Sequence, residues 1–147
     1  MIGDGSYMMA NSELATAVAM DHKITVVLTD NRGYGCINRL QIATGGAEFN
    51  NLLDHAAYKN PVPIDFAAHA KSMGAEARKV GSIQQLEAAL AETRNDPRTT
   101  VIVIETDPYP VPDTGGAWWD VAVPEVSERA EVRAARENYE ARLKERS

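Results

Sequence analysis

The stretch ITVVLTDNRGYG, residues 24–35, decides the fold of this chain. Residues 24–29 form a continuous, largely β-branched run, which is typical of a strand buried in a parallel sheet. Residues 30–35 then change to a polar segment that contains two glycines. Open parallel sheets bind their ligands where the strands end, at the carboxyl edge. The stretch therefore predicts a parallel strand that carries polar groups to a ligand-binding edge.

A second polar block, Gly3-Asp4-Gly5-Ser6-Tyr7, stands upstream of this strand. Asp4 precedes Asn31 by 27 positions, and one helical pattern and one strand lie between them. This separation can bring a carboxylate and a carboxamide to one sheet edge, where their oxygens suit Mg²⁺ or Ca²⁺. The glycines let the backbone approach a phosphate, to which amides opening the next helix can donate. Each block alone also fits an ordinary turn, but the pair at this spacing favours a cofactor site.

Helix and strand patterns alternate along the rest of the chain. The expected elements are helices at residues 12–21, 34–40, 65–74 and from Ser82, with strands at 24–29, 75–80 and 100–106. Asp65 and Ser82 are suited to cap helix N-termini, and Gly74 is suited to end a helix. This alternation predicts an α/β fold: a doubly wound parallel sheet with flanking helices. Residues 41–63 lack a pattern and are long for a connector, so we expect a functional or a mobile loop there.

Both ends of the chain depart from this alternation. Only Met1 and Ile2 precede the first glycine turn, although a strand should deliver it. Because a sheet without that strand would expose apolar flanks, we expect truncation at the N-terminus or a strand from a partner; a very short strand is the alternative. From residue 107 prolines and two tryptophans replace the alternation, and charged residues follow. We therefore divide the chain into an α/β domain at 1–106, an extended tail at 107–126 and a charged helix at 127–147, capped by Ser127.

Composition excludes several classes of function. A net charge of −6 over 147 residues argues against a nucleic-acid-binding protein, whose affinity requires basic surface. No apolar run approaches the roughly 20 residues that a membrane helix requires. The single cysteine, Cys36, cannot form an internal disulfide, and the first residues do not resemble a signal peptide. We therefore expect a cytoplasmic protein.

The two polar blocks resemble the signature of thiamine-diphosphate enzymes, a Gly-Asp-Gly turn followed by an Asn-Asn-type segment. In that family the aspartate, the second asparagine and a backbone carbonyl two residues later bind Mg²⁺. The resemblance implies that Asp4, Asn31 and the carbonyl of Gly33 are the metal ligands here. Asp30 replaces the first asparagine of the usual pair, a position that is not itself a ligand.

The same resemblance implies where thiamine diphosphate binds. Its diphosphate would lie against Gly5 and Ser6, with Tyr34 and Gly35 nearby. The glutamate that activates the cofactor in this superfamily lies on another domain, usually of another subunit, and no residue of this chain matches its motif. We therefore assign no catalytic residue, and we predict no turnover by the chain alone. The implied partners are the missing N-terminal domains and a second subunit of a homo-oligomer.

Over its whole length the chain is similar to one branch of this superfamily, the trihydroxycyclohexanedione hydrolases of inositol breakdown. The stretches that carry the similarity are residues 3–7 with 11–13, 30–35, 64–70 with 73–75, and 105–108 with 118–121 and 124–127. The double-tryptophan tail is the most distinctive of them. This resemblance implies cleavage of a ring C–C bond of a cyclic dione, with the cofactor as electron sink. The alternatives are a carboligase or decarboxylase such as acetolactate synthase, or an interaction module without cofactor.

Other reactive side chains have weaker interpretations. The three histidines lack the spacing of metal ligands, and only His55 is a candidate for meeting substrate; His22 is expected at a helix end and His69 on a helix surface. Cys36 is better interpreted as a small packing residue than as a reactive thiol. Two tryptophans, Trp118 and Trp119, could line a substrate site, but packing or a subunit interface is the favoured interpretation. Three aspartates are interpreted as turn and cap residues: Asp54, Asp65 and Asp113.

Overall fold

The computed structural model describes residues 1–110 and 119–146, which form two compact units. The sheet unit comprises Met1–Gly33 with Tyr58–Asp107, and the helical unit comprises Tyr34–Ala57 with Pro108–Ser147. These units follow the contacts between residues, which group residues 34–57 with the C-terminal part of the chain. The predicted division of the chain at residues 106 and 126 stays a prediction.

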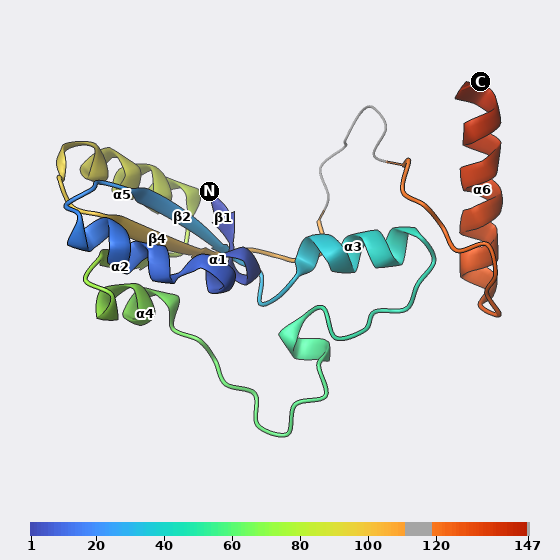
Figure 1. Cartoon of the computed structure of the whole chain (residues 1–147), viewed down its shortest axis with the longest axis horizontal. Helices are drawn as coiled ribbons and strands as arrows, with labels where there is room; N and C mark the ends of the chain where they lie inside the picture. Colours follow the sequence, from blue (N-terminus) through green and yellow to red (C-terminus); the bar gives the residue numbers. More distant parts are fainter. Residues whose placement is uncertain (111–118, 147) are drawn as a thin grey trace. The chain divides into compact units, whose positions relative to one another are not determined.

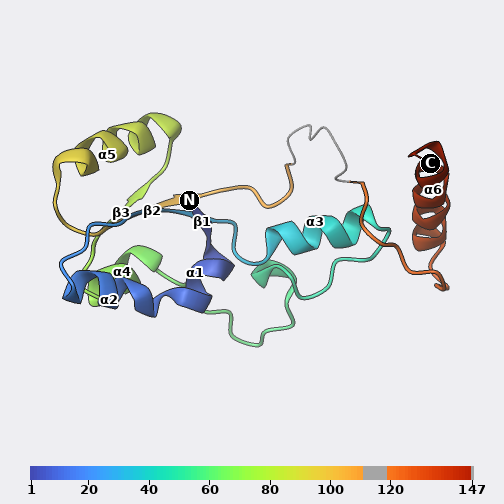
Figure 2. The same cartoon turned by 45° about the horizontal axis from the view of Figure 1, so that its top comes forward.

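The sheet unit is a four-stranded parallel sheet with helices on both faces (Figures 1 and 2). Its strands are β1 (Ile2–Gly3), β2 (Thr25–Asp30), β3 (Glu76–Val80) and β4 (Thr100–Glu105), in the order β1-β2-β4-β3. One face packs against α1 (Asp4–Ala10), α2 (Ser12–Ala19) and α4 (Phe66–Ser72), and the other against α5 (Ile83–Asn95). This arrangement confirms the predicted doubly wound α/β fold.

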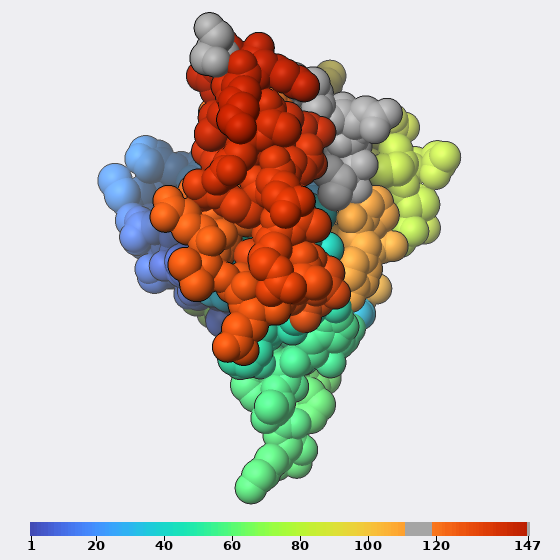
Figure 3. All heavy atoms as spheres, turned by 90° about the vertical axis from the view of Figure 1, so that its right-hand side faces the viewer, coloured from blue at the N-terminus to red at the C-terminus, as the bar shows by residue number. Residues whose placement is uncertain are grey.

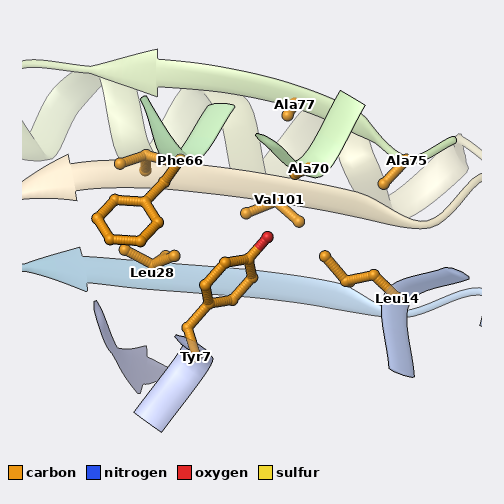
Figure 4. Packing of buried hydrophobic residues seen from close by; sticks show 9 residues of the cluster. Tyr7, Leu14, Leu28, Phe66, Ala70, Ala75, Ala77 and Val101 are labelled. Carbon is orange, nitrogen blue, oxygen red and sulfur yellow. The ribbon is translucent and has the colours of Figure 1, made fainter. Parts of the chain in front are cut away.

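The central strand β4 supplies the core of both layers. Val101 and Val103 pack with Tyr7, Leu28 and Phe66 on one face of the sheet, as Figure 4 shows for most of this cluster. The alternate residues of β4 face the opposite layer, where Ile102 and Ile104 pack with Val27, Val80 and Ala89. The run from residue 100 to residue 104 is therefore buried throughout, as expected for a strand covered on both faces.

Replacement of Ile102 by alanine tests this core. Ile102 is completely buried, so we expect the free energy of unfolding to fall by about 2–5 kcal/mol, measured by urea denaturation. Ile83, which is 61% exposed at the start of α5, is a matched control, and its replacement by alanine should change stability by less than about 0.5 kcal/mol. Equal effects of the two substitutions would contradict the assignment of Ile102 to the core.

The predicted helix ends are confirmed. Asp65 Oδ1 accepts a hydrogen bond from the Ala68 amide (2.9 Å), and Ser82 Oγ accepts one from the Gln85 amide (3.2 Å). The Gln85 side chain accepts from the amide of Gly81 rather than from that of Ser82, so the reciprocal bond of a capping box is displaced by one residue. Gly74 follows α4 with a φ of 88°, a conformation that favours glycine.

The start of the chain forms the very short strand that the sequence left as an alternative. Ile2 pairs with Leu28, and Gly3 pairs with Thr29, at the edge of the sheet. Thr29 Oγ1 also donates to the carbonyl of Ile2 (3.2 Å). The short strand β1 therefore delivers the glycine turn, and N-terminal truncation stays a prediction.

The helical unit contains α3 (Gly35–Ala43), the 3-10 turn η1 (Leu53–His55) and α6 (Ala130–Arg146). α6 lies beside the segment 119–126 (Figure 3). Arg136 Nη1 on α6 donates to the carbonyl of Val123 (2.9 Å). Within the part of the chain that the structure describes, no helix has both the length and the apolarity to cross a membrane.

Two predicted boundaries in this unit were wrong. α3 continues to Ala43, three residues beyond the predicted end. The last helix begins at Ala130 rather than directly after Ser127. The guanidinium of Arg133 donates to the carbonyls of Ser127 (3.1 Å) and Glu128 (2.6 Å), which holds the residues before α6 in a turn.

Candidate functional site

The predicted metal ligands meet where β1 and β2 end. Asp4 directly follows β1 as the first residue of α1, and Asn31 directly follows β2. Since the two strands are paired in parallel, their ends lie side by side. Asp4 is buried, with 4% of its surface exposed, and its Oδ2 accepts a hydrogen bond from the Gly33 amide (2.7 Å). The structure thus brings Asp4, Asn31 and Gly33 together; their binding of a metal stays a prediction.

The turn after β2 has an unusual backbone that directs its groups toward Asp4. Arg32 and Gly33 have φ angles of 56° and 147°, both in the region that favours glycine. Asp30 Oδ1 accepts from the amide of Arg32 (3.0 Å) and so stabilises the turn from within. Asp30 therefore has a structural role in the turn, consistent with its position outside the predicted ligand set.

The carboxamide of Asn31 decides whether this site suits a cation. Its oxygen faces two other oxygens, Oδ1 of Asp4 and the carbonyl of Gly33. With the amide turned over, its nitrogen would donate to the same two atoms at 3.1 and 2.9 Å. The orientation with the nitrogen inward satisfies both ends of the amide, whereas a bound cation would require the oxygen to face Asp4 and Gly33.

The spacing of these groups is compatible with Mg²⁺. An octahedral Mg²⁺ lies about 2.1 Å from each ligand, which places neighbouring ligand oxygens about 3.0 Å apart. The separations around the Asn31 amide, 3.1 and 2.9 Å, are ordinary hydrogen-bond distances from its nitrogen, and they are close enough that the same atoms could reach one cation. Among the residues described, no group of three or more His, Cys, Asp and Glu side chains could hold a metal. The predicted site is of a different kind, because its ligands are one carboxylate, one side-chain amide and one backbone carbonyl.

The electrostatics of Asp4 favour a positive neighbour. Burial raises the pKa of Asp4 above its ordinary value. The hydrogen bond from the Gly33 amide opposes this shift in pKa, and the nearby charge of Asp30 adds to it. A divalent cation would offset both the lost hydration and the repulsion from Asp30.

The four residues predicted to contact thiamine diphosphate divide between the two units. Gly5 and Ser6 lie in the first turn of α1, and the N-cap Gly3 provides no side-chain hydrogen bond to the amides there. Tyr34 and Gly35 belong to the helical unit, where the Tyr34 amide donates to the carbonyl of Asn51 (2.7 Å). Their contacts with the cofactor stay predictions.

The role of Tyr7 was not anticipated from the sequence. Its ring is buried and packs edge-on against Phe66, with 5.6 Å between the ring centroids. Its hydroxyl lies 2.9 Å from Nδ1 of His69. His69 is half-buried on α4, and the interpretation of it as a helix-surface residue left out this partner, which Tyr7 supplies across 62 positions of sequence. This pair ties α1, which carries Asp4, to α4.

The remaining candidates have structural outcomes. Cys36 is exposed, so its interpretation as a packing residue was wrong; it lies on the outer side of α3. His22 is exposed just after α2, as expected. Trp119 packs near Tyr139 (6.1 Å between ring centroids), with the Arg142 guanidinium over its ring, which confirms its packing role. Trp118 and Asp113 lie outside the described residues.

Comparisons with known proteins show the family of this chain. The family described as "Thiamine pyrophosphate enzyme, C-terminal TPP binding domain" matches residues 1–104. The chain is 40% identical over 144 residues to the 3D-(3,5/4)-trihydroxycyclohexane-1,2-dione hydrolase 2 of Bacillus cereus, covering 94% of this chain and 22% of that protein. It is 37% identical over 144 residues to the corresponding hydrolase of Halalkalibacterium halodurans, covering 97% and 22%.

A solved structure supports the fold independently. Benzoylformate decarboxylase from Polynucleobacter necessarius superposes with a TM-score of 0.65 at 23% identity, covering 76% of this chain and 20% of that one. The chain spans about a fifth of the length of the curated relatives it matches. From the match over residues 1–104, the parallel sheet and the polar edge, we conclude that the chain belongs to the thiamine pyrophosphate enzyme family, as its C-terminal TPP-binding domain.

Proposed function

We propose that this chain forms the diphosphate- and Mg²⁺-binding part of a thiamine-diphosphate-dependent hydrolase that opens the ring of trihydroxycyclohexane-1,2-dione in inositol breakdown. The observation that carries the metal site is the convergence of oxygens from Asp4, Asn31 and Gly33 at the sheet edge. The substrate assignment rests on the names of the relatives, which match nearly the whole chain at 37–40% identity.

The residues at the sheet edge would bind and orient the cofactor rather than react. Asp4 and Asn31 would supply side-chain oxygens to Mg²⁺, and Gly33 its carbonyl oxygen. The free amides at the start of α1, beside Gly5 and Ser6, would donate to phosphate oxygens. Thiamine diphosphate, when bound, supplies the electron sink for breaking the C–C bond. The remaining domains and a second subunit would complete the site in a cytoplasmic homo-oligomer.

Titration calorimetry tests the binding part of this proposal. We expect the purified chain to bind thiamine diphosphate in the presence of Mg²⁺ and to lose that binding when EDTA removes the metal. A chain that is folded by circular dichroism but shows no Mg²⁺-dependent binding would contradict the proposal and favour a non-catalytic interaction module. Ring opening tested against decarboxylation and carboligation in the assembled enzyme would distinguish the hydrolase from other members of the superfamily.

The isolated chain is predicted to have no turnover, because no residue in it matches the glutamate that activates the cofactor. The measurement is consumption of trihydroxycyclohexane-1,2-dione by the chain saturated with thiamine diphosphate and Mg²⁺. Ring opening above the rate without protein would show that the activating group lies within these 147 residues.

A further inference from the structure

A series of polar side chains in the helical unit lies outside the predicted cofactor site. Asn38 Nδ2 donates to Glu48 Oε1 (2.8 Å), and Glu48 Oε2 lies 3.2 Å from Nδ1 of His55. On the other side of the imidazole, Nε2 of His55 lies 3.2 Å from the hydroxyl of Tyr109. A phenol, an imidazole and a carboxylate are thus linked one after another in space.

The series runs from the interior to the surface. Asn38 on α3 is completely buried, whereas the side chains of Glu48 and His55 are 31% and 34% exposed. Tyr109 is 47% exposed. The outer end of the series is therefore a tyrosine that is accessible to a small molecule.

Asn38 is a costly residue at its position. Its Oδ1 is buried and has no hydrogen-bond partner among the residues described, and an unpartnered buried polar atom costs about 1–3 kcal/mol. Its other side-chain atom donates to Glu48. The asparagine therefore fixes the orientation of the Glu48 carboxylate at the expense of stability.

The Glu48 carboxylate sets the tautomer of His55. A carboxylate can only accept hydrogen bonds, so the ring proton of the neutral imidazole belongs on Nδ1. Nε2 is then an acceptor, and the hydroxyl of Tyr109 donates to it. This is the order of groups that activates a hydroxyl in nucleophilic and general-base catalysis: an acidic O–H, a base, and a third group that orients the base.

Within the helical unit, the loop that carries this series is fastened to α3 and to Tyr34. Gln41 Nε2 donates to the carbonyl of Ala47 (2.6 Å), and the Asn51 carbonyl accepts from the amide of Tyr34 (2.7 Å). Tyr34 directly follows Gly33 in the chain. Arg39 Nη1 donates to the carbonyl of Pro108 (2.7 Å) and so holds the residue before Tyr109. The expected irregular loop is thus an ordered support for His55.

We infer that Tyr109 is the general base of this segment, acting on a water molecule or a hydroxyl group of a polyhydroxylated cyclic ketone, and that His55 and Glu48 position and activate it. This inference rests on the proposed function, since hydrolysis of a C–C bond consumes one water molecule.

The proton balance of this step is closed. The water oxygen forms a new C–O bond to a carbonyl carbon of the substrate with one of its electron pairs. The π pair of that C=O bond moves onto the carbonyl oxygen, and one O–H bond of the water breaks. The released proton goes to the oxygen of Tyr109, while the proton that Tyr109 held moves to Nε2 of His55. When the C=O bond re-forms, the ring C–C bond breaks and its electron pair stays on the departing carbon. That carbon takes the proton from the His55 imidazolium, which is paired with Glu48.

Replacement of Tyr109 by phenylalanine in the assembled enzyme tests this inference. General-base catalysis contributes about 10²–10⁴-fold, so we expect kcat to fall at least about 100-fold. The KM for the dione and the Kd for thiamine diphosphate should change less than about threefold. Tyr58 is 60% exposed and is the matched control, so Tyr58→Phe should leave kcat unchanged. Adding His55→Gln to Tyr109→Phe should reduce kcat little further, because residues that act as one unit are not additive.

A second measurement does not depend on turnover. A proton held between Nδ1 of His55 and Glu48 should give a downfield imidazole resonance in the proton NMR spectrum of the chain. We expect this resonance to persist in Tyr109→Phe and to disappear in Glu48→Gln and His55→Gln. Its persistence in Glu48→Gln would overturn the assigned tautomer and the inference.

The kinetic outcomes separate this inference from the proposed function. If Tyr109→Phe binds thiamine diphosphate normally and turns over within threefold of the unsubstituted enzyme, the inference is wrong. Weakened cofactor binding in Tyr109→Phe but not in Tyr58→Phe would also overturn it, because Tyr109 would then act through the cofactor site. An unsubstituted protein that does not bind thiamine diphosphate would overturn the proposed function, and this inference with it.

Discussion

Replacement of Asp4 by alanine is expected to weaken Mg²⁺-dependent binding of thiamine diphosphate by about 100-fold or more. Even groups that only support a metal ligand change affinity by about 10–100-fold, and Asp4 would contribute the only charged ligand. Its Oδ2 is occupied by the Gly33 amide, so Oδ1 is the atom available to the cation. The measurement is calorimetric titration of the chain with the cofactor at saturating Mg²⁺.

The chain offers a matched control at the neighbouring carboxylate. Asp30→Asn also removes one negative charge close to the site, but the Asp30 carboxylate accepts from the Arg32 amide within its own turn and is not a predicted metal ligand. An asparagine can accept the same hydrogen bond, so we expect the cofactor affinity of Asp30→Asn to change less than about threefold. Similar losses in both variants, at unchanged circular dichroism, would show that charge near the edge matters rather than ligation by Asp4.

Replacement of Gly45 by alanine is expected to produce a large loss of stability in the helical unit. Gly45 has a φ of 82°, and a Cβ placed there would lie 2.4 Å from the carbonyl oxygen of Glu131 and 2.6 Å from the nitrogen of Val132. Both are backbone atoms of α6 and cannot move aside by a rotamer change. Overpacking costs about 1–3 kcal/mol and the left-handed backbone a further 1–2 kcal/mol.

The consequence should be confined to the packing of α6 within the helical unit. Hydrogen exchange would detect it as faster exchange of α6 amides in Gly45→Ala, while the amides of β2 and β4 keep their protection. Gly81→Ala is the control, since a Cβ there would meet only the flexible Gln85 side chain at 3.8 Å. Unchanged exchange of α6 in Gly45→Ala would contradict the close approach of these two segments.

The fold was predictable because its signals are local. The apolar run before Asp30 and the capping side chains Asp65 and Ser82 each specify an element from within a few residues. The end of α3 was missed because the sequence has no stop signal at residue 40. The helix continues to Ala43, and the hydroxyl of Thr44 then donates to the carbonyls of Leu40 and Gln41.

The site was predictable only in part. The positions of Asp4 and Asn31 after two parallel strands are enough to predict their approach. No local pattern connects Tyr7 with His69, or His55 with Tyr109, because these pairs are separated by 62 and 54 positions. Asn38 could have drawn attention to this group of residues. It is a polar residue on α3 that is completely buried, and a buried polar side chain needs a partner.

The amide of Asn31 has a further consequence for how the site is filled. Exchanging its nitrogen for its oxygen requires rotation about one side-chain bond, and the two orientations occupy nearly the same volume. An apoprotein prepared with a chelator should therefore keep the backbone of its holoprotein, and reconstitution should proceed without a slow refolding phase. Capture of the ion would be limited by its own dehydration, which is slow for Mg²⁺. Stopped-flow reconstitution with the faster-exchanging Mn²⁺ should accordingly be quicker than with Mg²⁺ at equal concentrations.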